Sequence, residues 1–105
     1  MSLWDRLFGV RPPAPPMPPD DSPPDVGPNQ TLVVVIPSKN GRSRAYVTFE
    51  AGIGYRVMSE SWWSEDGYAL WEPRGSRAIF ADSRERAEQL AREELVLSGN
   101  PPEIA

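Results

Sequence analysis

The side chains that most often perform catalysis or hold metals are scarce in this sequence. Its 105 residues include neither cysteine nor histidine, which excludes disulfides, thiol nucleophiles, structural zinc sites and Ser-His-Asp triads. Acid–base chemistry would depend on carboxylates, but Asp20-Asp21 lies among prolines and Glu65-Asp66 lies in a turn signal. Neither pair is typical of a buried acid–base couple. We therefore expect a non-enzymatic protein that uses no cofactor and no metal.

Tryptophans are the residues best suited to form a binding surface. The chain has 4, and Trp62 and Trp63 are adjacent. Neighbouring residues of a strand point to opposite faces of a sheet, so one of these two rings should lie on the face that a single helix leaves open. An exposed indole is typical of a surface that binds a partner protein, and Trp71 is expected to join it. The alternative is that a bulge or loop directs both rings into the core.

A second binding element is predicted at the N-terminus. On a helix, Leu3, Trp4, Leu7 and Phe8 would share one side. A helix this short is unstable alone in water, so it would become ordered on binding. Three interpretations remain open: docking in a groove of a larger partner protein, which we favour, burial in a membrane interface, or packing against its own domain.

Arginines among the aromatic residues raise an alternative, a sheet face that binds single-stranded nucleic acid. The candidate residues are Arg42, Arg44, Arg56, Arg74 and Arg77. However, 11 basic and 15 acidic residues give a formal net charge of −4, whereas nucleic-acid-binding domains are usually basic. We therefore expect a protein partner rather than nucleic acid, and pairing of two copies through the open sheet face is a further use of the same surface.

The chain divides into four parts. Residues 1–10 are predicted to be a short amphipathic docking peptide, and residues 11–30 hold most of the 13 prolines. Proline fixes φ and lacks an N–H, so this second segment is predicted to be a linker, in polyproline II conformation or disordered. Its PxxP matches are also typical of ligands for proline-binding domains. Residues 31–98 are predicted to form one small domain, and residues 99–105 a flexible tail.

The domain is predicted to be α+β, with an antiparallel meander of four or five strands and one C-terminal helix packed on one face. Strands are expected over residues 31–36, 44–50, 55–62 and 68–72, with a short fifth strand over 77–80. Asn40-Gly41 and Asp66-Gly67 are hairpin signals. Apolar residues at 87, 90, 91 and 95 follow helical spacing after a cap expected at Asp82, and Gly99 is expected to end the helix.

The sequence contains no apolar run of the roughly 18 residues that a membrane span needs, and residues 1–10 lack the features of a signal peptide. We therefore expect a cytoplasmic protein. The predicted function is that of an adaptor or accessory protein, which binds a larger partner through the N-terminal peptide and the aromatic surface. The alternatives are a module for single-stranded nucleic acid and a small protein tethered to a membrane surface.

Overall fold

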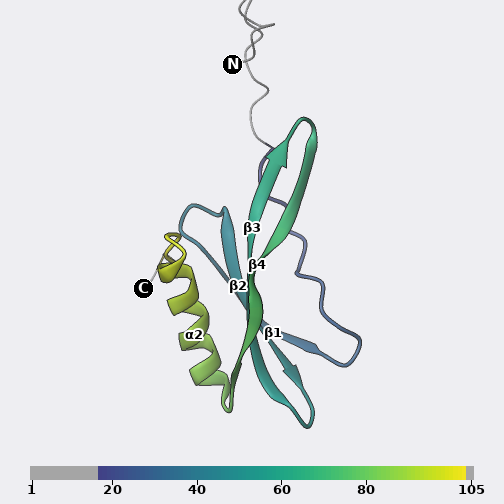
Figure 1. Cartoon of the computed structure of the whole chain (residues 1–105), viewed down its shortest axis with the longest axis vertical. Coiled ribbons are helices and arrows are strands. Elements are labelled where there is room, and N and C mark those ends of the chain that lie inside the picture. Colours follow the sequence, from purple (N-terminus) through teal and green to yellow (C-terminus); the bar gives the residue numbers. More distant parts are fainter. Residues whose placement is uncertain (1–16, 104–105) are drawn as a thin grey trace, which may run out of the picture.

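The described part of the chain folds into one antiparallel sheet and one helix (Figure 1). The computed structural model describes residues 17–103, apart from the side chains of residues 75–78. The elements, in chain order, are β1 (Thr31–Pro37), β2 (Ser43–Glu50), β3 (Gly54–Glu65), β4 (Tyr68–Ala81) and α2 (Arg84–Leu97). The strands are neighbours in the order β1-β2-β3-β4, which confirms the predicted meander with a C-terminal helix.

The hairpin between β3 and β4 forms as its sequence predicts. Glu65 lies opposite Tyr68, so the loop consists of Asp66 and Gly67. Both have positive φ angles, 50° and 83°, which is the requirement of a type I′ turn and the reason for glycine at the second position. In Figure 1 this hairpin extends beyond the rest of the sheet.

The last strand differs from the prediction. Pro73-Arg74-Gly75 was expected to separate a fourth strand from a fifth over residues 77–80, but β4 is continuous through this region. The break appears instead as an irregular register, because Met58 of β3 stands opposite residues 75–78 of β4. Pro73 is tolerated within the strand because β4 lies at the edge of the sheet, where one row of N–H groups has no ladder partner.

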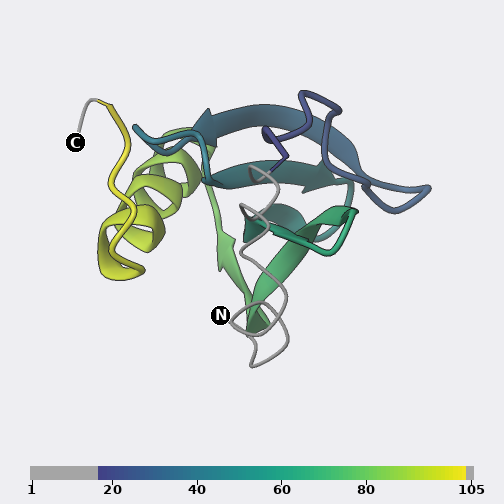
Figure 2. The ribbon, with the colours of Figure 1, turned by 90° about the horizontal axis from the view of Figure 1, so that it is seen from above.

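The hydrophobic core lies between α2 and one face of the sheet (Figure 2). Ala87, Ala91 and Leu95 are buried on the helix, at the predicted spacing. They pack against Ala45 and Val47 of β2 and against Val57 of β3. Because residues alternate between faces along a strand, this packing directs the intervening residues of β2 and β3 to the opposite face of the sheet.

Both ends of α2 are capped by side-chain or backbone groups. The N-cap is Ser83 rather than Asp82, and its Oγ accepts a hydrogen bond from the N–H of Arg86 at 3.2 Å. Beyond the helix, Gly99 has a φ of 81° and the N–H of Asn100 donates to the carbonyl of Leu95 at 2.9 Å, as in a glycine-based helix stop.

The C-terminal segment was expected to be a flexible tail, but its described part is attached to the domain. The N–H of Lys39 donates to the carbonyl of Pro101 at 2.9 Å, and Ser38 forms an antiparallel bridge with Pro102, which is buried. Residues 99–103 therefore extend the fold, because they meet the turn that joins β1 to β2.

Candidate functional site

The face of the sheet opposite α2 carries aromatic and charged side chains in adjoining rows. Strand pairing places Arg44 of β2 beside Glu60 of β3, and Trp62 of β3 beside Trp71 of β4. Tyr46 lies two residues beyond Arg44 and therefore on the same face. We refer to the surface formed by Arg44, Tyr46, Glu60, Trp62 and Trp71 as the aromatic groove.

The two indoles of the groove support each other. Their ring centroids are 5.3 Å apart and the ring planes cross at 68°, an edge-to-face arrangement that is favourable for aromatic pairs. The guanidinium carbon of Arg44 lies 4.0 Å from the centre of the Trp71 ring, in a cation–π contact. These contacts fix the directions in which the two indole N–H groups point.

A buried ion pair underlies the groove. Nε of Arg44 donates to Oε1 of Glu60, and each residue is only 7% exposed. Within the described residues, every buried side-chain nitrogen and oxygen has a hydrogen-bond partner. The pair is electrically neutral, so the groove itself carries little net charge and is suited to neutral, partly apolar ligands.

A proline-rich segment of the same chain lies along the aromatic groove. Nε1 of Trp62 donates to the carbonyl of Met17 at 3.0 Å, and Nε1 of Trp71 donates to the carbonyl of Asp20 at 2.9 Å. Nη1 of Arg44 donates to the carbonyl of Ser22 at 2.6 Å. All three contacts are made to backbone oxygens, so they do not depend on which side chains the bound segment carries.

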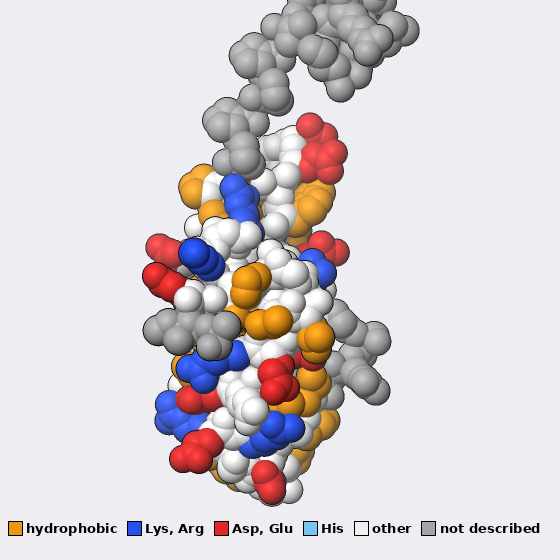
Figure 3. Space-filling view, turned by 90° about the vertical axis from the view of Figure 1, so that its left-hand side faces the viewer, with side chains coloured by type: hydrophobic (Ala, Val, Ile, Leu, Met, Phe, Trp, Pro, Cys, Tyr) orange, Lys and Arg blue, Asp and Glu red, His pale blue; other side chains and the backbone are white. Residues whose placement is uncertain are grey.

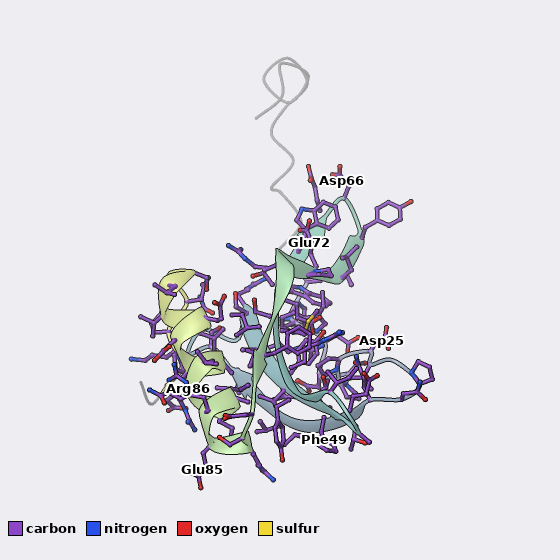
Figure 4. The ribbon with its side chains drawn as sticks, turned by 60° about the horizontal axis from the view of Figure 1, so that its bottom comes forward. Asp25, Phe49, Asp66, Glu72, Glu85 and Arg86 are labelled. Carbon is purple, nitrogen blue, oxygen red and sulfur yellow. The ribbon has the colours of Figure 1, made fainter. Side chains whose placement is uncertain are left out.

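This contact changes the interpretation of the segment that was expected to be a free linker. Between residues 17 and 25 the chain follows the sheet, with Pro24 buried and Pro19 half-buried. Figure 4 shows Asp25 on the side of the sheet away from α2. A cleft of about 430 Å³ remains between residues 20–25 and the groove. The segment therefore occupies the groove without filling it.

A local turn interrupts the bound segment. Oδ1 of Asp20 accepts hydrogen bonds from the N–H of Ser22 at 2.8 Å and from its Oγ at 2.7 Å. These bonds stabilise the carboxylate and lower the pKa of Asp20, with a smaller contribution from the positive charge of Arg44. The turn separates the carbonyl that Trp71 binds from the carbonyl that Arg44 binds.

The buried phenol of Tyr46 makes the free energy of unfolding sensitive to alkaline pH. Burial raises the pKa of Tyr46, and the nearby charge of Glu60 raises it further. Tyrosine in the unfolded chain ionises first, near pH 10. The free energy of unfolding is therefore unaffected below that pH and falls as the pH rises above it.

We expect Tyr46→Phe to reduce this fall in the free energy of unfolding. Chemical denaturation between about pH 9 and 11 measures it, and an equally steep fall in the variant would contradict the assignment.

Trp63 lies on the opposite face of the sheet from the groove. It pairs with Leu70, and the two side chains are 40% and 47% exposed. One tryptophan of the adjacent pair was expected on the open face. The structure places Trp62 there, where residues of the same chain half-cover it, and leaves Trp63 more accessible. This occurs because the β3–β4 hairpin extends past the region that α2 covers (Figure 1).

The described arginines of the nucleic-acid alternative do not form one free basic surface: Arg44 and Arg56 share the face opposite α2, and Arg74 lies on the other face. Arg44 is buried in its ion pair, and Arg56 lies over the Phe80 ring, with its guanidinium carbon 5.2 Å from the ring centre. Nη1 of Arg74 donates to Oγ of Ser61 at 3.2 Å, and Ser61 is on the face that packs against α2. Arg42 is half-buried before β2, and the side chain of Arg77 lies outside the described residues.

Among the described residues, the side of the molecule that carries α2 has no basic track of its own (Figure 3). On the side of the molecule that carries α2, basic and acidic side chains are interspersed and form no large patch of one sign (Figure 3). A groove for single-stranded nucleic acid combines stacked aromatics with a continuous positive track along the phosphates. The described arginines do not form such a track beside the aromatic groove, because Arg44 is held in its ion pair and Arg74 lies on the face that carries α2.

The remaining predicted binding residues, Leu3, Trp4, Leu7 and Phe8, lie outside the described residues. Within residues 17–103, no cluster of three or more potential acidic ligands could hold a metal ion. The helix of this part, α2, is neither long nor apolar enough to cross a membrane.

Comparisons with protein-family models, curated proteins and solved structures find no match for this chain. The function must therefore be inferred from the aromatic groove itself.

The sequence did not indicate that Arg44 and Glu60, the charged members of the aromatic groove, form a pair. Opposite charges in neighbouring strands are a weak signal of a cross-strand contact. The sequence signal for the segment bound in the groove is that its proline pairs recur with a period of three residues.

Proposed function

We propose that this protein is a non-enzymatic adaptor that holds an extended segment of a partner protein in the aromatic groove. The observation that carries the proposal is the direction of three donors. The indole N–H groups of Trp62 and Trp71 and the guanidinium of Arg44 all bind backbone carbonyls, at Met17, Asp20 and Ser22. A surface that binds a backbone in this way can accept another chain of similar conformation.

The composition of the groove also favours protein recognition. Tryptophan and arginine are the residues most enriched among those that dominate binding energy at protein interfaces. Both tryptophans are held by neighbouring side chains, so little conformational freedom is lost when a ligand binds. The unfilled cleft beside residues 20–25 gives a partner additional surface to contact.

The chain's own segment acts as a competitor in this proposal. A tethered segment has an effective concentration in the millimolar range, so a partner must bind more strongly than the resident residues or displace them only in part. Many of the resident side chains, including Asp20, Asp21 and Pro23, are exposed to solvent. The resident contact therefore depends on a few hydrogen bonds and on two prolines, and a better ligand can replace it.

Removing the two indole donors tests the adaptor function. We expect the full chain with Trp62→Phe and Trp71→Phe to lose about ten-fold or more of its binding to protein partners recovered from a native lysate, because each lost hydrogen bond costs about 1 kcal/mol. Quantitative affinity enrichment measures the loss. Trp63→Phe is the matched control, since it removes an indole from the opposite face. Equal recovery with all three chains would contradict the proposal.

A further inference from the structure

The prolines that precede the bound segment follow a period of three. A pair of prolines follows each of three residues: Arg11, Ala14 and Met17. Asp20 comes directly after the third pair. The sequence from 11 to 20 is therefore three consecutive x-Pro-Pro units, followed by one more x position. Of these units, the last one, residues 17–19, lies within the described residues, together with the x position that follows it, Asp20.

The two indoles bind the flanks of that last unit. Trp62 takes the carbonyl of Met17 and Trp71 takes the carbonyl of Asp20, so the accepting residues are three apart and enclose Pro18 and Pro19. The polyproline II helix has three residues per turn and rises about 3.1 Å per residue, so carbonyls three apart lie on one side, about 9 Å from each other. Two N–H donors that bind carbonyls three residues apart therefore match a ligand with this period.

The x-Pro-Pro pattern preorganises such a ligand. A residue that precedes proline is restricted to extended or polyproline II conformations, and this restriction applies to Met17 and to Pro18. Proline itself has φ fixed near −65° and no N–H. The ligand therefore loses little conformational entropy on binding and leaves no backbone donor unpaired at either proline.

The side chains at the x positions contribute little to recognition. Met17 is 46% exposed and Asp20 is exposed as well, while Pro19 between them is half-buried. The groove thus binds the flanking carbonyls, and Pro19 lies beside Arg44 and Trp71, whereas Pro18 is exposed. This arrangement makes the identity of x unimportant and the proline spacing decisive.

We propose that the aromatic groove is a binding site for x-Pro-Pro-x segments of partner proteins, in which x is any residue. The inference rests on the proposed adaptor function and names the ligand class of the same site. Residues 17–20 are then the internal occupant that such a partner displaces.

The probe for the test is a synthetic peptide of residues 11–20, capped at both ends. The protein is the full chain in which every proline from Pro12 to Pro19 is replaced by serine, so that no internal unit competes. The indole N–H signals of Trp62 and Trp71 in nuclear magnetic resonance spectra report binding directly. We expect the peptide to shift these two signals and to bind this variant about ten-fold or more tightly than the unchanged chain, because the tethered competitor has been weakened.

Three controls separate the proposal from unspecific binding. A peptide in which the second proline of each pair is replaced by alanine has no Pro-Pro pair and should bind about ten-fold more weakly, since it lacks the preorganised unit. Replacing the x residues other than Ala14, which are Arg11, Met17 and Asp20, with alanine should leave binding within about three-fold, because the groove binds backbone carbonyls. In the protein, Trp62→Phe should weaken binding about five-fold, the value of one hydrogen bond, while Trp63→Phe should not.

The outcomes distinguish the ligand class from the adaptor function. Equal binding of the peptide without Pro-Pro pairs would overturn the x-Pro-Pro proposal. So would signals of Trp62 and Trp71 that do not shift, in the variant or in the unchanged chain, at high peptide concentration. If the tryptophan double variant still lost its lysate partners, the adaptor function would stand with a different ligand. If the same two signals shifted with protein concentration alone, the occupant would be a second copy of the chain and not a partner protein.

Discussion

Replacing Arg44 with methionine is expected to lower the free energy of unfolding by about 3–5 kcal/mol, the usual cost of removing one member of a buried ion pair. Glu60 would remain buried without its partner, since the residue is only 7% exposed. The change also removes the cation from the Trp71 ring and the donor from the carbonyl of Ser22. Denaturation with urea at neutral pH, followed by tryptophan fluorescence, measures the loss.

Two further variants isolate the cause. Replacing Arg44 and Glu60 together by methionine should restore most of the stability, because an apolar pair of similar size removes the uncompensated charge. Arg74→Met is the matched control. Its side chain is exposed and, among the described residues, donates a hydrogen bond to Ser61, so the expected change is within about 0.5 kcal/mol. A double variant as unstable as the single one would show that packing at Arg44, rather than the charge of Glu60, sets the cost.

The elements that depend on local sequence were predicted well. The spacing of Ala87, Ala91 and Leu95 indicated which side of the helix is buried, because helical periodicity and burial are linked directly. Asp66-Gly67 indicated the last hairpin, because few other dipeptides adopt two successive positive φ angles without strain. The helix start was misplaced by one residue, since Asp82 and Ser83 are both good caps and the choice depends on the path of the chain.

The features that depend on tertiary contacts were not predictable in the same way. The bound segment makes its hydrogen bonds through backbone carbonyls, which every residue has, so no side chain marks it as a ligand. A run of prolines is equally typical of a spacer and of a bound polyproline helix. The alternation of Trp62 and Trp63 was foreseeable, but the extent of cover on each face depends on where α2 ends along the sheet and on the return of residues 17–25.

The one large aliphatic side chain of α2 that is wholly buried, Leu95, is the residue on which the attachment of the helix should depend most. It is 0% exposed and packs in a cluster whose other helical members are alanines. Leu95→Ala is expected to lower the free energy of unfolding by about 2–5 kcal/mol, through lost burial and the cavity left between the helix and the sheet. Small single domains have about 5–15 kcal/mol in total, so this one change removes a large share of it.

Leu97→Ala is the matched control on the same helix. Leu97 is 81% exposed, and the same truncation there should change stability by no more than about 0.5 kcal/mol. Comparing the two by urea denaturation cancels the effect of alanine on helix propensity, since both positions lie in the last turn of α2. Similar losses in the two variants would mean that α2 contacts the sheet through another side. In that case the face of the sheet assigned to the core, and with it the assignment of the groove to the opposite face, would be wrong.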